Sequence, residues 1–559
     1  MLWAILPILS LQSDFTLTDK GNPKCSIVLP ARSSLGTLHG ASALVDFIKQ
    51  MSGATLPIIS KPNKGSNIEL IQSSKMGSEE YVIECKSNQI KIIGGSLRGV
   101  MYGCYGLLQD HFGCHWYTST ISAIPHNSTL QLAPFTDHQM PAFEYREPYF
   151  TEAFETNWAA RNRINGNSMH LSDAEGGRVI YGKFVHTSSE LVPPEIYFKS
   201  HPEYYALVNG KRNPDQLELT NPEVAKIAIQ TVEKWIQDNP KAKIFSVSQN
   251  DNYGQSQSPE SQAINKQEGA PSGLLLRFVN KVAAAIAKDH PNVLIDTLAY
   301  QWTEKPPLIT RPLPNVRIRL APIGADYAHA LNQSPQNKEP YTNLLAWANI
   351  THQLYIWSYC TDFASYLQPL PDLDEIANDI PLFKKNGVVG IFYEGDYAPG
   401  GGGDMAELKS YLIAHLLWNP NLSAAAIVDD FCDHVYGAAA PEVESWLNLV
   451  HESARVRGTP ASIYDGPNAP YFTADVLSQG DALFQKALAA VQSDPVALEE
   501  VQKAQLGLQR VELGQAKAGT PQYQALAKEV GDKIIEFGIQ QTSEGGSSAD
   551  FLKSIGYTP

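Results

Sequence analysis

The chain lacks the features that assign many proteins to a class at first sight. Its 43 Lys and Arg against 58 Asp and Glu give a net charge of −15, and no basic stripe is visible, which argues against a nucleic-acid partner. The acidic balance is better interpreted as a solubility feature than as a sign of function. No stretch beyond the start reaches ~18 uninterrupted apolar residues, so we expect no membrane span.

Cysteine is scarce, and its spacing excludes the common metal sites. None of the six cysteines shows CxxC spacing, so a zinc knuckle is not expected. Cys104 and Cys114 are near enough in sequence to form a disulfide, although free buried thiols are equally compatible with the sequence. His170 and His186 lack the spacing to acids that a metal site needs. The six cysteines are Cys25, Cys85, Cys104, Cys114, Cys360 and Cys432.

Nucleotide-binding and acyl-transfer motifs are missing as well. No G-x-G-x-x-G or G-x-x-x-x-G-K-[ST] pattern follows an expected strand, which removes the main support for a nucleotide fold. No G-x-S-x-G elbow or Ser-His-Asp set is visible, so an acyl-transfer enzyme is disfavoured. We therefore predict neither a metal nor a cofactor.

The start of the chain, residues 1–11, is apolar. It resembles the apolar region of a secretory signal, with Ser10 and Ser13 as small residues before Asp14. No Lys or Arg precedes it and no good cleavage motif follows, so a buried first strand or a truncated start is the alternative. We treat residues 1–13 as a possible signal remnant and expect a secreted or periplasmic protein.

At 559 residues the chain is too long for one core, and its pattern divides into parts. Residues 14–138 read as a small α/β domain, with strands near 25–30, 80–85 and 89–94. A helix over 38–53 has apolar side chains on one face and Gly53 where a C-cap is wanted. A second helix over 98–113 ends at Gly113. Residues 421–559 contain helical patterns only, so we expect a helical C-terminal region without strands.

Residues 139–420 alternate apolar runs with helical stretches, which indicates a parallel sheet. Helices are expected at 222–238, 274–289 and 374–386. Eight strands closed on themselves form a TIM-like (β/α)8 barrel, which suits this length; an open doubly wound sheet is the alternative. The expected strands are 143–150, 168–172, 182–187, 244–250, 293–300, 316–322, 353–360 and 388–394.

The last of these strands, 388–394, ends on an acid and is followed by a second acid and a run of glycines. An apolar run, 389–393, stops at Glu394, Asp396 follows, and four glycines occupy 400–403. A plain strand end with a surface carboxylate and a mobile glycine tip explains this pattern. An active site at the mouth of a barrel, with backbone pressed close to a ligand, explains it equally.

Active sites of such barrels lie at the carboxyl ends of the strands. Two acids stand there after long apolar runs, Asp251 and Glu394. Cleavage of a glycosidic bond needs one acid to protonate the leaving oxygen and a second group to stabilise positive charge at the anomeric carbon. Asp251 alone fits an Asx turn equally well. We take the two acids as candidate catalytic residues.

Other strand-end residues are candidates for substrate binding. Aromatic rings cover the apolar faces of sugars, and polar side chains hold hydroxyl groups, although each of these residues has a purely structural alternative. The ring-stacking candidates are Trp302, Trp357, Tyr359 and Tyr393. The remaining candidates are Arg146, His186, Asn250, Tyr300 and Asp396.

Three stretches resemble known families. The stretch 81–117, YVIECKSNQIKIIGGSLRGVMYGCYGLLQDHFGCHWY, is similar to the N-terminal domain of β-hexosaminidases and α-glucuronidases. The stretches 186–212 with 246–252 (SVSQNDN), and 391–420 (IFYEGDYAPGGGGDMAELKSYLIAHLLWNP), resemble the bacterial domain-of-unknown-function 4838 group. Part of that group is classified as glycoside hydrolase family 163, endo-β-N-acetylglucosaminidases that cut complex N-glycans. The likeness covers roughly residues 30 to 435.

The resemblance implies a retaining glycoside hydrolase that cleaves β-linked N-acetylglucosamine in N-glycans or related glycans. In one mechanism Asp251 and Glu394 are acid/base and nucleophile, and Asn250 before Asp251 weakly favours that order. In the other the substrate's acetamido oxygen attacks, Asn250 or Asp251 orients it, and Glu394 donates the proton. Ser256, Ser258 and Ser261 stand where the group has cysteines, so a structural or metal role for that loop is expected to be absent.

Two alternatives to this function stay open. An α-glucuronidase-like enzyme fits the N-terminal resemblance but needs a basic cluster for the uronate, and Arg146 is the only clear strand-end cation. A non-catalytic glycan-binding protein on the same scaffold is the other. The expected partner in every case is a glycan, either an oligosaccharide or a glycoprotein.

Overall fold

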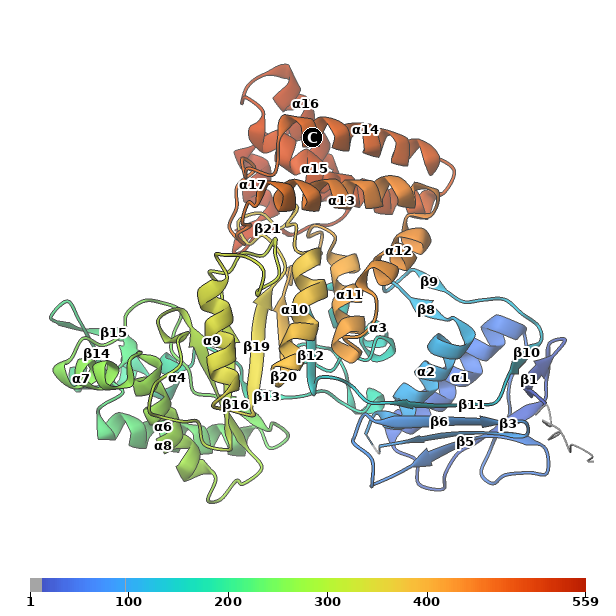
Figure 1. Cartoon of the computed structure of the whole chain (residues 1–559), viewed down its shortest axis with the longest axis horizontal. Helices are drawn as coiled ribbons and strands as arrows, with labels where there is room; N and C mark the ends of the chain where they lie inside the picture. The colour runs from blue at the N-terminus through green and yellow to red at the C-terminus, as the bar shows by residue number, and fades with distance from the viewer. Residues whose placement is uncertain (1–12, 96, 559) are drawn as a thin grey trace, which may run out of the picture. The chain divides into compact units, whose positions relative to one another are not determined.

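The computed structural model of the chain describes residues 13–95 and 97–558 (Figure 1). The possible signal remnant at 1–13 lies, except for its last residue, outside the described residues. The chain forms two compact units: Met1–Pro141 with Glu155–Arg163 and His170–Arg178, and Ala142–Phe154 with Ile164–Met169 and Val179–Pro559. Within the described ranges, no helix combines the length and apolarity that crossing a membrane requires.

The first unit is the expected small α/β domain. Helices α1 (Leu35–Ser52) and α2 (Gly99–Phe112) pack together on a six-stranded sheet (Figure 1). Gly53 ends α1 in the left-handed conformation, φ 79°, and its N–H donates to Lys49 O, as a C-cap glycine does. The sheet order is β11 (Phe135–Gln139), β6 (Tyr81–Lys86), β7 (Gln89–Gly94), β5 (Ser66–Gln72), β3 (Cys25–Val28), β4 (Ile58–Ile59).

Smaller elements complete this unit. The helix α3 (Thr156–Arg161) comes from one of the two later segments that join it. All six cysteines of the chain are buried and free, so the disulfide that the Cys104–Cys114 spacing allows does not form. The remaining strands are β1 (Phe15–Asp19), β2 (Asn22–Pro23), β8 (His115–Trp116), β9 (Ser122–Ala123) and β10 (Leu130–Leu132).

The second unit is built on a seven-stranded, wholly parallel sheet, consistent with a TIM barrel. Seven of the eight strands expected from the sequence are present. The last strand pairs with the first, Tyr145 lying opposite Gly390. The order is β12 (Tyr145–Tyr149), β20 (Val388–Glu394), β19 (Leu354–Tyr359), β18 (Val316–Ala321), β17 (Leu294–Tyr300), β16 (Ile244–Ser246), β13 (Tyr181–Lys183).

The strand expected at 168–172 is wrong, and a buried carboxylate is the reason. Glu147 is fully buried and accepts hydrogen bonds from the N–H groups of Asn167 (3.0 Å) and Ser168 (2.8 Å), which are therefore not available to a strand ladder. Asn165 still connects β12 with the segment that leads into β13: its N–H donates to Arg146 O, and its C=O accepts from Val179 N. An irregular segment thus takes the place of the second barrel strand.

Helices alternate with these strands as the sequence predicts. α6 begins with Asn221 as N-cap and Pro222 at its first position, the arrangement that favours a helix start. The helices of this part are α4 (Ser188–Leu191), α5 (Pro194–Tyr197), α6 (Pro222–Asp238), α7 (Pro259–Glu268), α8 (Ser272–Ile286), α9 (Lys338–Ala348), α10 (Leu373–Lys385) and α11 (Ala406–Trp418). A hairpin of β14 (Tyr205–Val208) and β15 (Lys211–Leu217) stands between α5 and α6. Single 3-10 turns occur at Glu152–Phe154, Asp173–Glu175, Pro202–Tyr204, Gln301–Thr303 and Gly437–Ala439.

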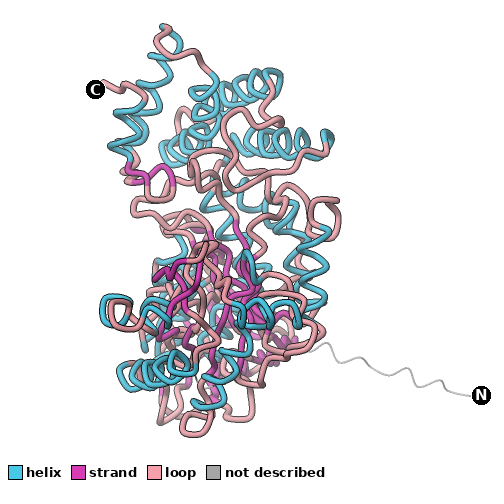
Figure 2. Tube along the Cα trace, turned by 90° about the vertical axis from the view of Figure 1, so that its left-hand side faces the viewer, coloured by secondary structure: helices cyan, strands magenta, loops and turns pink. Residues whose placement is uncertain are grey.

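The C-terminal part is helical, with one departure from expectation. Strands do not end at residue 421, because β21 (Gln541–Ser543) and β22 (Gly546–Ser547) form a hairpin, drawn as magenta strands below the C-terminal helices in Figure 2. A core cluster joins the loop residue Leu367 to α15, α16 and Ile539. The helices are α12 (Ala424–Val435), α13 (Ala440–Arg457), α14 (Ala474–Ala490), α15 (Pro495–Gln515), α16 (Pro521–Glu536) and α17 (Ser548–Ser554).

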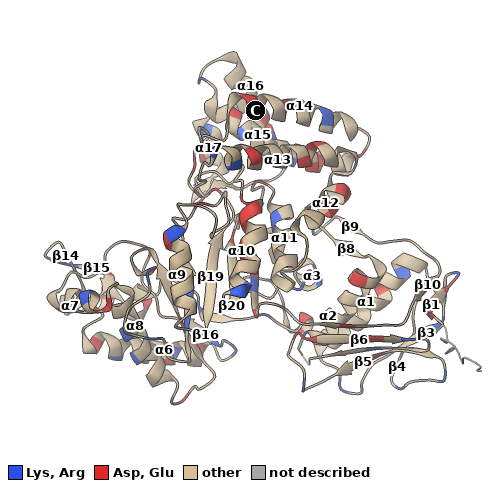
Figure 3. Cartoon of the chain, viewed as in Figure 1, with Lys and Arg blue, Asp and Glu red and all other residues tan. Residues whose placement is uncertain are grey.

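Charged residues are spread along both units. Figure 3 shows Lys and Arg interspersed with Asp and Glu, without a continuous basic stripe in this view. Several of the charges that are buried lie inside the sheet, where Arg319 pairs with Asp296 at 2.6 Å. The ion pair therefore neutralises two charges that the fold removes from water.

Candidate active site

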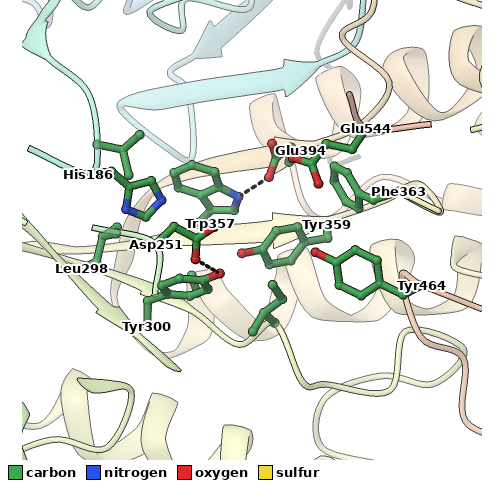
Figure 4. A pocket seen from close by; sticks show the side chains of 13 residues that line it. His186, Asp251, Leu298, Tyr300, Trp357, Tyr359, Phe363, Glu394, Tyr464 and Glu544 are labelled. Atoms are coloured by element: carbon green, nitrogen blue, oxygen red, sulfur yellow. Dashed lines mark hydrogen bonds between the residues drawn. The ribbon is translucent and has the colours of Figure 1, made fainter. Parts of the chain in front are cut away.

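A cavity of about 240 Å³ opens at the carboxyl ends of the parallel strands (Figure 4). Parallel strands place these ends at one edge, so side chains far apart in sequence meet there. Its lining mixes aromatic rings with three carboxyl groups. The lining residues are Val185, His186, Asp251, Leu298, Tyr300, Ala321, Ile323, Trp357, Tyr359, Phe363, Glu394, Tyr464 and Glu544.

Strand geometry explains which residues enter the cavity. Side chains alternate between the two faces of a strand, so residues two apart share a face. Trp357 and Tyr359 of β19 obey this rule, as do Leu298 and Tyr300 of β17. The cavity wall is therefore a consequence of the period-two pattern at the ends of the strands.

Glu394, the last residue of β20, has an unusual environment. The indole Nε1 of Trp357 donates to its Oε2 at 2.8 Å. Burial raises the pKa of Glu394 to about 8; the Trp357 hydrogen bond opposes this rise, and the charges of Glu544 and Asp251 add to it. The carboxyl group is consequently protonated at neutral pH and is able to donate a proton.

Trp357 is itself held from several sides. Its ring and that of Phe392 pack edge to face, with centroids 4.6 Å apart, and the guanidinium carbon of Arg319 lies 5.2 Å from its centroid. Arg319 is fixed by its ion pair with Asp296 inside the sheet. Packing and cation–π contact thus fix the donor that orients the Glu394 carboxyl group.

Asp251 follows β16 and faces the same cavity. Its Oδ1 accepts hydrogen bonds from Tyr300 OH and from Gln301 Nε2, both at 3.0 Å. Among the described residues, none donates to its other oxygen, Oδ2. Asp251 is exposed to solvent at the cavity mouth, whereas Glu394 lies deeper. The two acids therefore share one hollow but differ in environment.

Two residues beside the cavity hold left-handed backbone conformations that non-glycine residues rarely adopt. His186 has φ 54° and Gln301 has φ 51°. His186 Nδ1 donates to Gln249 O at 2.9 Å, which turns the other ring nitrogen away from that carbonyl. Strain of this kind persists where the surroundings impose it, and it gathers at functional sites.

Two of the predicted binding residues have side chains on the opposite face of their strands. Arg146 is fully buried; its Nη1 donates to Phe143 O at 2.7 Å and its guanidinium carbon lies 5.4 Å from the Trp418 ring of α11. Tyr393 donates to Glu375 of α10 at 3.3 Å. Neither lines the cavity, since the strand alternation directs both toward the surrounding helices.

Three other predicted binding residues support loops around the cavity rather than line it. Asn250 Nδ2 donates to Ser189 Oγ and to Asp215 O. Trp302 Nε1 donates to Asn252 O, and its ring lines a separate, smaller hollow. Asp396 is buried and its Oδ1 accepts from Ala398 N at 2.9 Å, which shapes the loop after β20. Of the predicted set, Asp251, Glu394, His186, Tyr300, Trp357 and Tyr359 line the cavity.

Among the lining residues that were not predicted from the sequence, Phe363, Tyr464 and Glu544 lie outside the strands of the sheet. Phe363 lies in the loop after β19, and the other two belong to the C-terminal part, Tyr464 in the connection between α13 and α14 and Glu544 in the turn of the β21–β22 hairpin. Burial raises the pKa of Glu544, and the charge of Asp251 adds to the rise. No local pattern distinguishes them from ordinary loop residues.

The glycine run after Glu394 is explained by packing within the protein. A Cβ on Gly400 (φ 89°) would lie 2.2 Å from Gly538 O, and one on Gly402 (φ 94°) would lie 2.5 Å from the Ile539 side chain. Only glycine fits both the conformations and the close approach. The backbone here packs against the C-terminal segment before β21, so it is no free surface tip.

The serine-rich loop after Asp251 has a structural role, contrary to expectation. Ser256 Oγ and Ser261 Oγ donate to the two oxygens of Glu218, at 2.6 and 2.7 Å. Ser258 caps α7. The three serines thus hold the loop by hydrogen bonds. Among the residues that the structure describes, no group of three or more His, Cys, Asp or Glu side chains is arranged to hold a metal ion.

Comparison with known families gives a match over residues 116–448 to the family described as "Domain of unknown function (DUF4838)". The chain belongs to the DUF4838 family. A comparison with curated proteins found no match.

Solved structures similar to this DUF4838 chain include a family GH115 4-O-methyl-α-glucuronidase with specificity for decorated arabinogalactans: TM-score 0.56, 11% identity, covering 97% of this chain and 76% of the other. The Flavobacterium johnsoniae chitobiase of family GH20 matches with a TM-score of 0.48 and 14% identity over 97% of each chain. At such identity the glucuronidase likeness shows a shared fold and nothing about substrate.

Proposed function

We propose that this DUF4838 chain is a retaining glycoside hydrolase that hydrolyses the O-glycosyl bond of β-linked N-acetylglucosamine, in the manner of an endo-β-N-acetylglucosaminidase of N-glycans. The observation that carries the proposal is the convergence of Asp251 and Glu394 on one aromatic cavity. A cavity of about 240 Å³ suits one sugar ring, since pockets for drug-sized ligands are about 300–1,000 Å³.

The environments of the two acids favour one assignment of roles. Glu394, with its pKa near 8, is the proton donor to the leaving glycosidic oxygen. Because its Oε2 accepts the Trp357 N–H, the acid proton sits on Oε1. This assignment corresponds to the second mechanism open from the sequence, in which Glu394 is the acid.

In that mechanism the C1–O bond breaks as Glu394 protonates the leaving oxygen, and the acetamido carbonyl oxygen of the substrate bonds to C1. Asp251 accepts a hydrogen bond from the acetamido N–H and stabilises the positive charge, while Tyr300 and Gln301 hold its other oxygen. Water then attacks C1, the bond between C1 and the acetamido oxygen breaks, and the Glu394 carboxylate takes a proton from the water. The two displacements together retain the anomeric configuration.

The rings and the imidazole have supporting roles in this proposal. Trp357 and Tyr359 stack on or flank the sugar, and His186 and Tyr300 bind its hydroxyl groups. Arg146, Asn250, Trp302, Tyr393 and Asp396 act through the loops and strands that they hold. We also propose export to the periplasm or the exterior, on the strength of the apolar start alone.

The alternative of an α-glucuronidase lacks support at the site. Among the described residues, no Lys or Arg lines the cavity, whereas three carboxyl groups do. Since Glu394 is protonated, a uronate would meet repulsion from Asp251 and Glu544 instead of the cationic partner that it needs. The likeness to the GH115 structure concerns the fold and does not change this local argument.

The test is incubation with a complex N-glycoprotein and a panel of aryl glycosides, with products identified by mass spectrometry. We expect release of a glycan that leaves one N-acetylglucosamine on the protein. Free glucuronic acid would support the glucuronidase instead. Binding without turnover of any glycan, with unchanged affinity in Glu394→Gln, would identify a glycan-binding protein.

A further inference from the structure

The C-terminal part contributes two residues to the lining of the cavity. Figure 4 shows Glu544 next to Glu394, and Tyr464 with its hydroxyl directed toward Tyr359. Neither Glu544 nor Tyr464 belongs to a strand of the parallel sheet. We call these two residues the C-terminal wall.

Backbone hydrogen bonds fix the C-terminal wall to the loop after β19. Phe363 N donates to Ile463 O at 2.7 Å, next to Tyr464, and Phe363 O accepts from Glu544 N at 2.9 Å. Tyr366 N donates to Thr542 O at 2.8 Å. One residue of the barrel loop, Phe363, therefore positions both members of the wall through its N–H and its C=O.

The glycine loop after Glu394 anchors the same hairpin from a second side. Gly400 and Gly402 lie against Gly538 and Ile539, the residues that lead directly into β21. The chain that carries Glu394 thus also determines where Glu544 stands. Such two-sided anchoring is what a preorganised binding group requires.

The C-terminal wall changes the charge of the cavity. Glu544 adds a third carboxyl group to those of Asp251 and Glu394, and no described Lys or Arg of the lining balances them. Carboxylates accept hydrogen bonds from sugar hydroxyl and amide N–H groups, and they repel a sugar that carries its own carboxylate. The wall therefore favours neutral sugars over acidic ones.

We propose that Glu544 is a specificity-determining residue: its carboxylate binds a neutral, hydrogen-bond-donating sugar such as an N-acetylhexosamine and excludes uronic and sialic acids from this subsite. This inference rests on the proposed function for its catalytic readout. Its binding readout is independent of turnover.

The experiment compares Glu544→Gln, which removes the charge, with Glu544→Asp, which keeps it. Dissociation constants for N-acetylglucosamine and for glucuronic acid are measured by quenching of tryptophan fluorescence, since Trp357 lines the cavity. The matched control is Glu536→Gln at the exposed end of α16. Values of kcat and KM are measured on an aryl β-N-acetylglucosaminide near pH 6.

Glu544→Gln is expected to weaken N-acetylglucosamine binding and to raise KM about 10-fold, the effect of one hydrogen bond to a charged group, with a small change in kcat. Its preference for the neutral over the acidic sugar should narrow, while Glu544→Asp and Glu536→Gln keep the wild-type preference. The inference is overturned if wild type and Glu544→Gln prefer the neutral sugar to the same degree, or if the wild type binds both sugars equally tightly.

The outcome for the hydrolase proposal is separate. A wild type that prefers the neutral sugar but cleaves no glycoside overturns only the hydrolase proposal, and a wild type that binds neither sugar overturns both.

Discussion

The cavity has two sides that differ in origin, and each supplies one glutamate. The side formed by β19 and β20 carries Trp357, Tyr359 and Glu394 at the ends of apolar strands. The C-terminal wall carries Glu544 on a hairpin turn and Tyr464 on a loop. The first side is fixed by the sheet, and the second by backbone contacts between loops.

The difference shows which information a sequence carries locally. A strand end after an apolar run is visible in a short window, because the parallel fold gathers such ends at one edge. The C-terminal wall depends on pairing between residues near 363 and residues near 463 and 544. No local period encodes a pairing over that distance.

The largest expected effect tests the strand side through neighbouring residues of β20. Glu394→Gln keeps the size of the side chain but removes the acid proton, so kcat should fall about 10²–10⁴-fold, the usual worth of a general acid. Tyr393→Phe removes only a hydrogen bond to Glu375 on the opposite face and should keep kcat within a few-fold. Steady-state kinetics on an aryl glycoside measures both.

Circular dichroism and thermal melting serve as controls, since each variant must remain folded for the comparison to hold. Equal losses in the two variants would mean that β20 matters as a whole and that Glu394 is not the acid. An unchanged rate in Glu394→Gln would remove this residue from the mechanism.

The alternation of side chains along each strand also explains which site residues could be predicted from the sequence. The ends of β19 and β20 were predictable, and Trp357, Tyr359 and Glu394 line the cavity. Tyr393 and Glu394 are consecutive and cannot share a face, so the sequence could have excluded one of them. The side chain of Arg146 likewise lies on the face of its strand that is turned away from the cavity, against Trp418.

Other differences from expectation arise from tertiary hydrogen bonds. The residues at 168–172 alternate in polarity as a strand does, but the Glu147 carboxylate binds the N–H groups of Asn167 and Ser168. The glycine run was visible in the sequence, whereas its partner, the segment at Gly538 and Ile539, was not. In each case a distant group decides the local conformation.

The second prediction concerns Gly400→Ala, a substitution that displaces the C-terminal wall although Gly400 does not line the cavity. Gly400→Ala places a methyl group where Gly538 O stands, so the hairpin must move and Glu544 with it. We expect KM for a neutral aryl glycoside to rise about 10-fold, because one charged hydrogen bond is lost. The measurement is the ratio of KM values in variant and wild type.

Gly401→Ala is the matched control for this prediction. Gly401 also has a left-handed backbone, φ 60°, but its added Cβ meets only the Thr151 side chain at 3.8 Å. Both variants place a non-glycine residue in a strained left-handed conformation, and only Gly400→Ala adds a steric clash with Gly538 O. Equal KM values in the two would mean that the glycine loop does not position the hairpin.

The third prediction concerns stability and compares Glu394→Gln with wild type at several pH values. The folded-state pKa near 8 exceeds the value of about 4.3 in an unfolded chain. Between these values the folded state binds more protons, so this group's contribution to stability falls as pH rises. The advantage in Tm of Glu394→Gln should therefore grow by a few degrees from pH 5 to pH 8; a constant difference would contradict the raised pKa.

The smallest expected effects separate the two sides by the direction in which each moves the Glu394 pKa. The Trp357 hydrogen bond lowers this pKa and the Glu544 charge raises it. Activity needs protonated Glu394, so the alkaline limb of the kcat profile should lie near pH 8 in the wild type. Trp357→Phe should move the limb to higher pH, and Glu544→Gln should move it to lower pH, each by up to about one pH unit. If both variants shift the limb in the same direction, then the two sides do not act on Glu394 in opposite senses, and another group must be the acid that the limb reports.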